Sequence, residues 1–99
     1  MAWFVKTETF TAEAAALPVE QRRIVIQQHR EWIARESASG RCVVSGFLVD
    51  HDRQPGDGGL LLFEATSFTD ALRWVESDPM IRSGFVVWKL SEWIVSRKI

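Results

Sequence analysis

The sequence has no tyrosine, a single cysteine (Cys42) and no long hydrophobic run. One cysteine cannot form an internal disulfide bond, and a lone thiol in an apolar stretch is typical of a small buried side chain in a reducing compartment. No apolar segment approaches the roughly 20 residues that a membrane-spanning helix needs. Residues 1–10 lack the basic start, apolar run and cleavage site of a signal peptide. We therefore expect a cytoplasmic protein that is not inserted in a membrane.

An excess of charge of one sign is also missing, since 12 basic residues stand against 13 acidic ones. This balance gives no long-range field, so nucleic acid and anionic membranes are not expected partners. Gly56, Gly58 and Gly59 precede an expected strand rather than a helix, and they match no dinucleotide or phosphate loop. There is no CxxC pair and no G-x-S-x-G motif. The sequence thus predicts neither a cofactor nor a bound metal.

What the chain does have is the composition of one globular domain. Its 99 residues are 46% hydrophobic and 25% charged, with five tryptophans and six phenylalanines. A chain of this length buries about 60 to 70% of the surface that its unfolded state exposes, so we expect a single domain over residues 1–99.

Hydrophobic periodicity and turn residues divide the chain into strand, helix, strand, strand, helix and strand. Strands are expected at residues 2–10, 41–50, 59–65 and 85–95, with a polar loop at residues 51–58. After a connector at residues 11–17, a helix is expected over residues 19–39, with Pro18 at its first helical position and Gly40 as its stop. The order predicts an α+β fold of ferredoxin-like type, βαββαβ, with two helices on one face of a four-stranded antiparallel sheet.

Apolar residues share one face of each expected helix. The first helix carries them at Val25, Ile26, Trp32 and Ile33. The second begins at Ser67, whose spacing to Asp70 is that of a capping box, and is expected to end at residue 77 or 78, before a proline. Its apolar stripe consists of Phe68, Ala71, Leu72 and Val75.

The sheet is expected to be apolar on both faces, because the strands show little alternation. Neighbouring residues that point to opposite faces are both apolar at Val43 and Val44, Leu60 and Leu61, and Val86 and Val87. Helices cover only one face, and the other needs a cover. The simplest cover is the same face of a second copy, so we expect a homodimer through the helix-free sheet face. The alternative is that the end strands curl or another segment folds over this face.

His29 and Asp78 are the first candidates for chemistry. His29 lies among the apolar residues of the first helix and is expected to point toward the sheet, where an imidazole needs a partner. Asp78 is expected at the C-terminal end of the second helix, where the helix dipole makes a carboxylate a better base. Each has an ordinary alternative: a histidine bonded to a backbone carbonyl, and an Asp-Pro dipeptide that starts a turn.

Two further segments hold candidate site residues. Ser45 and Gly46 interrupt an apolar strand, which is typical of a bulge or of a place where a ligand approaches closely. The loop holds four potential metal ligands, but their spacing matches no metal motif and predicts a solvated loop. These ligands are Asp50, His51, Asp52 and Asp57.

Together these segments resemble the YciI-like (YCII-related) family, small ferredoxin-like domains that form dimeric α+β barrels. The resemblance spans nearly the whole chain. It rests on the order and spacing of six motifs. They are WFVK at residues 3–6, H-x-x-W-I at 29–33, S-G-F-L at 45–48, G-G-L-L-L-F-E-A at 58–65, S-F-T-D-A-L at 67–72 and D-P-M at 78–80.

The resemblance implies an active-site pair of His29 and Asp78 in a pocket between helices and sheet, with Ser45 in the same region. One member of the family is a dehydrochlorinase acting on a chlorinated hydroxyhydroquinone, and the similar muconolactone isomerases share the dimeric barrel. Here Phe47 replaces the proline of the commoner S-G-P pattern, so the pocket mouth is expected to differ in shape.

These observations lead to the hypothesis of a cofactor-independent lyase or isomerase acting on a small cyclic or aromatic compound. His29 would be the general base or acid, Asp78 would orient and stabilise its charged form, and Ser45 would donate a hydrogen bond to a substrate oxygen. A second hypothesis is a non-catalytic dimeric module that binds a small ligand or a partner protein. It predicts that His29 is bonded to the backbone, lies beyond reach of Asp78 directly or through water, and faces no cavity. A third is a haem-associated or oxygen-using enzyme of another dimeric-barrel family.

Overall fold

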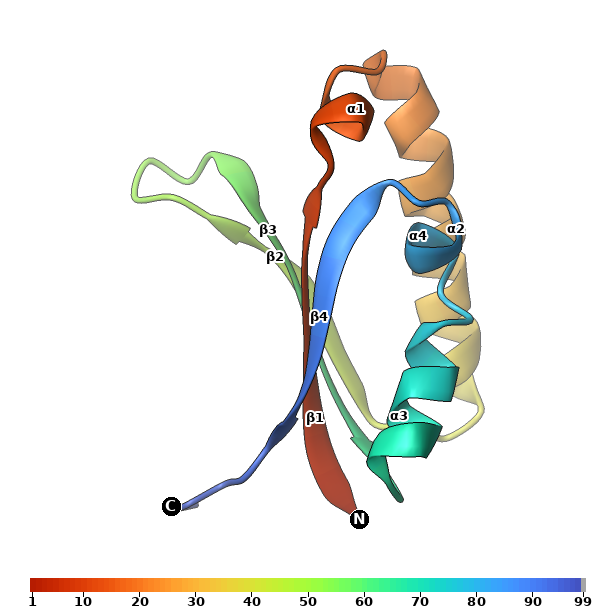
Figure 1. Ribbon diagram of the computed structural model, residues 1–99, viewed down its shortest axis with the longest axis vertical. Coiled ribbons are helices and arrows are strands. Elements are labelled where there is room, and N and C mark those ends of the chain that lie inside the picture. The colour runs from red at the N-terminus through yellow and green to blue at the C-terminus, as the bar shows by residue number, and fades with distance from the viewer. Residues whose placement is uncertain (99) are drawn as a thin grey trace.

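The computed structural model describes residues 1–98, which form one sheet with helices on one side (Figure 1). In chain order the elements are β1 (Ala2–Phe10), α1 (Ala12–Ala15), α2 (Val19–Ala38), β2 (Val43–Val49), β3 (Pro55–Ala65), α3 (Phe68–Val75), α4 (Pro79–Arg82) and β4 (Val86–Trp93). No helix within this part of the chain is long and apolar enough to span a lipid bilayer.

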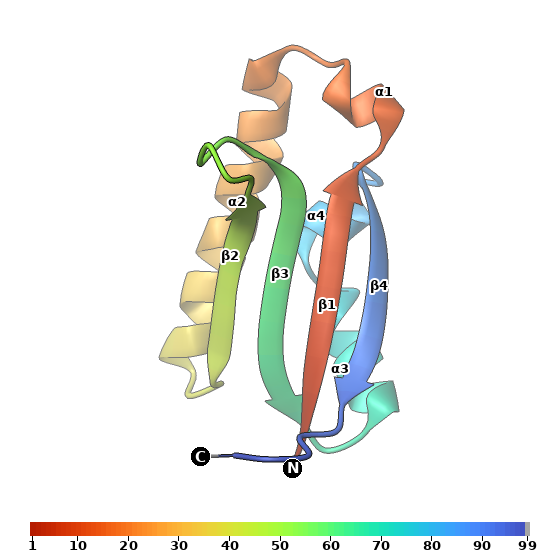
Figure 2. The ribbon, with the colours of Figure 1, turned by 90° about the vertical axis from the view of Figure 1, so that its left-hand side faces the viewer.

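The four strands form one antiparallel sheet in the order β2-β3-β1-β4, which Figure 2 shows from its bare face. The two central strands are therefore β3 and β1. This topology confirms the predicted α+β ferredoxin-like fold. In Figure 1 all the helices lie on one side of the sheet, and the tip of the β2–β3 hairpin extends toward the other side.

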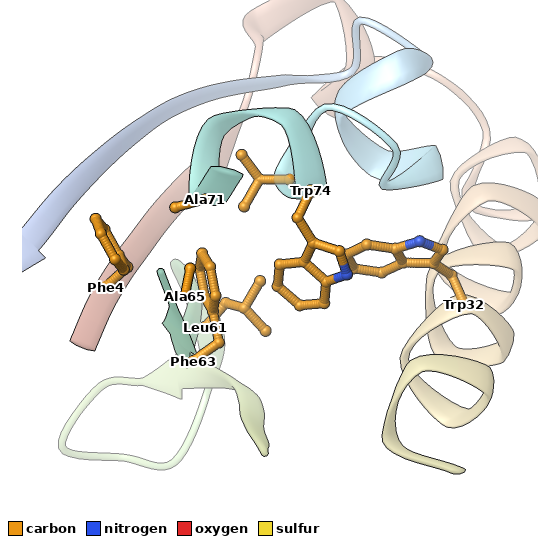
Figure 3. Close-up of a cluster of buried hydrophobic side chains, with 8 residues drawn as sticks. Phe4, Trp32, Leu61, Phe63, Ala65, Ala71 and Trp74 are labelled. Atoms are coloured by element: carbon orange, nitrogen blue, oxygen red, sulfur yellow. The ribbon is translucent and has the colours of Figure 1, made fainter. Parts of the chain in front are cut away.

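Alternation along the strands puts a packed core under the helices. Phe4 of β1 and Leu61 and Phe63 of β3 are buried on this face. From α3, Trp74 stacks on both Phe63 and Trp32 of α2, with ring centroids 4.5 and 4.6 Å apart (Figure 3). The core is thus an aromatic stack that joins the sheet to the two longer helices.

The helix α2 agrees closely with the expected one, ending at Ala38 before Gly40, whose φ of 100° suits glycine at a helix stop. Pro18 is the N-cap rather than the first helical residue. The apolar residues expected to share a face do so: Trp32 is buried, and Val25, Ile26 and Ile33 are half-buried.

Two short helices lie in segments where no helix was predicted. In the expected connector, Thr11 caps α1 by accepting a hydrogen bond of 3.0 Å from the Ala14 backbone N–H. After α3, Asp78 caps α4, with Pro79 at its first position. One turn of helix shows too little periodicity to be recognised in a sequence, whereas its caps are local and recognisable.

The capping function of Ser67 is confirmed, since its hydroxyl accepts a hydrogen bond from the Asp70 N–H. The Asp70 carboxylate does not complete a capping box and accepts instead from the Thr66 hydroxyl. The predicted stripe of α3 is partly wrong, because Phe68 is 47% exposed and Trp74 is buried in its place. The helix also ends earlier than predicted, at Val75.

The β2–β3 hairpin is longer than expected, because β3 begins at Pro55 and only the residues around 50–54 form the turn. The pairing of β2 with β3 becomes irregular between Phe47 and Val49. Gly46 pairs regularly with Leu60, so of the two alternatives for Ser45 and Gly46 the bulge is not found at these residues. Gly58 must be glycine: its φ is 98°, and a Cβ there would lie 2.2 Å from the Glu8 backbone oxygen.

The helix-free face carries many of the large exposed apolar side chains, as the strand patterns predicted. Val44 and Leu48 of β2 and Val87 and Trp93 of β4 point to this side and are between 43% and 64% exposed. Cys42, by contrast, is exposed, so the expectation of a buried thiol is wrong.

Candidate functional site

His29 and Asp78 contact each other across the space between α2 and α4. The Nδ1 atom of His29 lies 2.8 Å from Oδ1 of Asp78. The imidazole side chain is 14% exposed, while the Asp78 side chain has no exposed surface. The arrangement predicted by the non-catalytic hypothesis, with His29 beyond reach of Asp78, is therefore not found.

Asp78 lies at the beginning of a helix rather than at the end of one. As N-cap of α4, its Oδ1 accepts a hydrogen bond of 2.9 Å from the Met80 backbone N–H. The prediction that a helix C-terminus would make Asp78 a better base is wrong, because α3 ends three residues earlier and the favourable end of α4 faces this carboxylate.

Two residues that sequence analysis missed complete the site. Lys6, in the central strand β1, is fully buried, and its Nζ lies 3.2 Å from Oδ2 of Asp78 and 2.6 Å from Oε1 of Glu8. Lys6, Glu8, His29 and Asp78 are called the charged cluster below. The available signal was that Lys6 and Glu8 alternate in phase with the core residue Phe4, on the face that helices cover.

Burial by itself would raise the pKa of Asp78, but the hydrogen bond from His29, the charge of Lys6 and the Met80 N–H together outweigh it and hold the pKa below its ordinary value of 3.8. Asp78 is therefore an ionised acceptor at neutral pH. The atom facing it, Nδ1 of His29, must then carry the hydrogen and donate. When the imidazole carries one hydrogen, Nε2 is its free basic nitrogen.

The charged cluster should make stability depend on pH in the acid range. A carboxyl group with a lowered folded-state pKa contributes stability that is fully present above its unfolded pKa, here 3.8, and is lost as the pH falls through the folded value. The free energy of unfolding is expected to drop more steeply from about pH 5 downward in the wild type than in the Asp78→Asn variant. Urea unfolding across this pH range measures both slopes, and parallel slopes would contradict the assignment.

Ser45 lies on the same face of the sheet but is not joined to the pair. The strand register aligns Ser45, Leu61 and Lys6 in one row across β2, β3 and β1. Ser45 is exposed, and within residues 1–98 its hydroxyl makes no hydrogen bond to His29 or Asp78. Its role as a donor to a substrate stays a prediction.

The remaining candidate ligands do not converge. Asp50 accepts hydrogen bonds from the backbone N–H groups of Asp52 and Gln54, which stabilises the hairpin turn. The His51 side chain is 94% exposed. Among the residues described, no three histidine, cysteine or acidic side chains are grouped as a metal site requires. These residues fit a solvated turn.

A surface hollow lies elsewhere, near the N-terminal end of β1. It encloses about 420 Å³ and is lined by residues that include Arg41, Arg73 and Trp74, with neither His29 nor Asp78 among them. Arg41 is committed to structure there, since its guanidinium lies 4.5 Å from the Trp74 ring and donates to the Glu64 carbonyl oxygen.

Comparison with known proteins places the chain in a family. A family model described as YCII-related domain matches residues 3–94. The chain belongs to the YCII-related family. This YCII-related protein also matches the solved structure of 5-chloro-2-hydroxyhydroquinone dehydrochlorinase (TftG) from Burkholderia phenoliruptrix AC1100, in complex with 2,5-dihydroxybenzoquinone. The match has a TM-score of 0.69 and 18% identity and covers 93% of each chain, which establishes a shared fold. No curated protein sequence gives a significant match.

Proposed function

We propose that this YCII-related protein is a cofactor-independent lyase or isomerase for a small cyclic or aromatic compound, with His29 as its acid–base group. The observation that carries the proposal is the 2.8 Å contact between His29 Nδ1 and the buried carboxylate of Asp78. A histidine held by an ionised carboxylate has a fixed tautomer and orientation, which is what a general base requires.

The chemistry follows from that tautomer. Nε2 of His29 takes a proton from the substrate, and the electron pair of the broken bond forms a new double bond. In an elimination, the leaving group departs with its bonding pair, so that loss of HCl puts the proton on the imidazole and releases chloride. The charge of Asp78 then stabilises the imidazolium, and return of the proton at another carbon would give an isomerisation. Ser45, on the same sheet face, is proposed to donate a hydrogen bond to a substrate oxygen.

The structural relative supports this class of substrate. TftG is named as a dehydrochlorinase, and its structure contains 2,5-dihydroxybenzoquinone, a small flat ring. A fold shared over 93% of both chains makes a ring of similar size a reasonable first substrate to test. The His29 and Asp78 contact supplies the base that such an elimination needs.

The test is chloride release from a panel of chlorinated hydroquinones, with ring-opened and isomerised lactones followed in parallel. The His29→Ala variant is expected to lower kcat/KM by about 10²- to 10⁴-fold, because it removes the group that moves the proton. His51→Ala is the matched control, since that imidazole is 94% exposed in the hairpin turn and should leave turnover unchanged. Failure of the wild type to turn over any compound, with retained ring binding, would favour the non-catalytic binding module.

We also propose that the protein is a homodimer through its helix-free sheet face. The large apolar side chains on this face include Val44 and Val87, which are 58% and 64% exposed in the single chain. Burying such a face against its own copy removes it from water by a two-fold contact. The double variant Val44→Lys, Val87→Lys is expected to be monomeric by light scattering while keeping its fold, because neither side chain is part of the core. A wild type that is monomeric at micromolar concentration would contradict the dimer.

A further inference from the structure

One carboxylate oxygen of Glu8 is buried without a hydrogen-bond donor. Its Oε2 is buried and has no hydrogen-bond partner, the only such side-chain atom among residues 1–98. The other oxygen, Oε1, accepts from Lys6 Nζ at 2.6 Å, and the side chain is 11% exposed. A buried carboxylate oxygen without a donor is costly, and in native structures such an atom calls for an explanation such as a role in binding.

The position of Glu8 is shaped by its neighbours in the sheet. The register aligns Phe47, Gly59, Glu8 and Trp88 in one row across the four strands. A Cβ on Gly59 would lie 3.2 Å from Cγ of Glu8 and 3.4 Å from its Oε1, so the carboxylate lies over bare glycine backbone. Phe47, at one end of the row, is 66% exposed and points to the helix side of the sheet. Trp88, at the other, packs against the core.

Glu8 is also coupled to the proposed base. Lys6 Nζ contacts both Glu8 and Asp78, and Asp78 contacts His29. With Lys6 charged and both carboxylates ionised, the formal charges of these three residues sum to −1, and a proton on His29 brings the charged cluster to zero. The unpartnered oxygen of Glu8 therefore belongs to the same network of contacts as the imidazole of His29. On the sheet, Glu8 lies in the next row after Lys6 on the same face.

We propose that Glu8 Oε2 accepts a hydrogen bond from a hydroxyl group of a small ring substrate, and so selects phenolic or enolic rings over rings without a donor. Phe47 and Trp88 flank Glu8 and Gly59 in the row and offer apolar surface to the ring. This inference rests on the proposed function, since it places the ring beside His29. It adds a binding residue outside the His29 and Asp78 pair and states the substrate chemistry that the residue recognises.

The experiment measures equilibrium binding rather than turnover. Hydroquinone and 1,4-dimethoxybenzene, which has the same ring but no donor, are titrated calorimetrically and without oxygen into the wild type and Glu8→Gln. The glutamine keeps an oxygen for Lys6 but places N–H donors where Oε2 was. Glu8→Gln is expected to lower the affinity for hydroquinone about 10- to 100-fold, while the affinity for dimethoxybenzene changes by less than about twofold.

Two further variants separate recognition from damage. Gly59→Ala adds a methyl group 3.2 Å from Cγ of Glu8, so that this side chain must shift by a few tenths of an ångström. The variant is expected to weaken the binding of hydroquinone in the same direction with the Glu8 charge intact. Glu92→Gln removes an exposed carboxylate on β4 and should leave the affinity for both ligands unchanged.

The outcomes are distinct. Equal hydroquinone affinity in the wild type and Glu8→Gln, or binding of neither ring by the wild type, would overturn the inference. Hydroxyl-selective binding through Glu8 without turnover would sustain it while the proposed enzyme function fails. Chloride release with hydroquinone binding that does not depend on Glu8 would support the proposed enzyme function and overturn the inference about Glu8.

Discussion

Replacing Lys6 by methionine is expected to lower the free energy of unfolding by about 3 to 5 kcal/mol. Methionine fills a similar volume but removes the cation that lies between Glu8 and Asp78. Two carboxylates would then lie in the same buried region without their shared ammonium partner. Guanidinium unfolding of the purified variant at neutral pH measures the loss.

We expect the loss of unfolding free energy in Lys6→Met to come from charge and not only from packing. A second variant separates the two causes. In the double variant Lys6→Met, Glu8→Gln, one of the two opposing carboxylates is also neutral, so part of the lost stability should return. Lys98→Met is the matched control, because that lysine is exposed and should change stability by less than about 0.5 kcal/mol. If Lys6→Met is as stable as the control, the charged cluster does not hold the fold together.

The Asp78→Asn variant is expected to fold and to lose activity by about 10²- to 10⁴-fold in kcat/KM on any substrate found in the panel. Asparagine is a good N-cap, so its oxygen can still accept from the Met80 N–H. The amide has only one oxygen, however, and must serve Met80, His29 and Lys6. Whichever way it is turned, an N–H group faces either the ammonium of Lys6 or Nδ1 of His29.

In the second orientation the imidazole changes tautomer and Nε2 becomes protonated, so the base is lost. In the first orientation Lys6 keeps Glu8 but loses Asp78 as an acceptor, and the carboxylate charge that would stabilise an imidazolium is gone. Circular dichroism and thermal unfolding show whether the variant is folded, and Asp52→Asn in the exposed turn is the control. A folded Asp78→Asn protein with wild-type turnover would remove Asp78 from the mechanism.

The elements with long, strongly patterned segments could be predicted from the sequence. The first strand has the expected bounds, and α2 agrees to within a residue because its apolar face, Pro18 and Gly40 all mark the same helix. Expectations failed where structure depends on one or two local hydrogen bonds. The helices α1 and α4 are four residues each, and β3 extends past its apolar run to Pro55 through backbone pairing alone.

The site was predictable only in part, for a physical reason. His29 could be placed on the buried face of a helix, but Asp78 was assigned to the wrong helix end because Asp-Pro is compatible with either. Lys6 and Glu8 alternate in phase with the core residue Phe4, but their burial was missed, because a buried lysine is stable only if other charged residues neutralise it. Its partner Asp78 is 72 positions away, and no local pattern connects them.

The strand order has a consequence for how the chain folds during synthesis. β1 leaves the ribosome before the other strands, yet it lies between β3 and β4, whose residues run from 55 to 65 and from 86 to 93. One edge of this strand therefore lacks its partner until residues 55–65 have emerged, and the other edge until residues 86–93 have emerged. The contact of Lys6 with Asp78 likewise forms only after residue 78 has emerged. Pairing between strands so far apart in the sequence favours late, cooperative folding over stepwise assembly, and it leaves the edges of the nascent β1 strand open to aggregation.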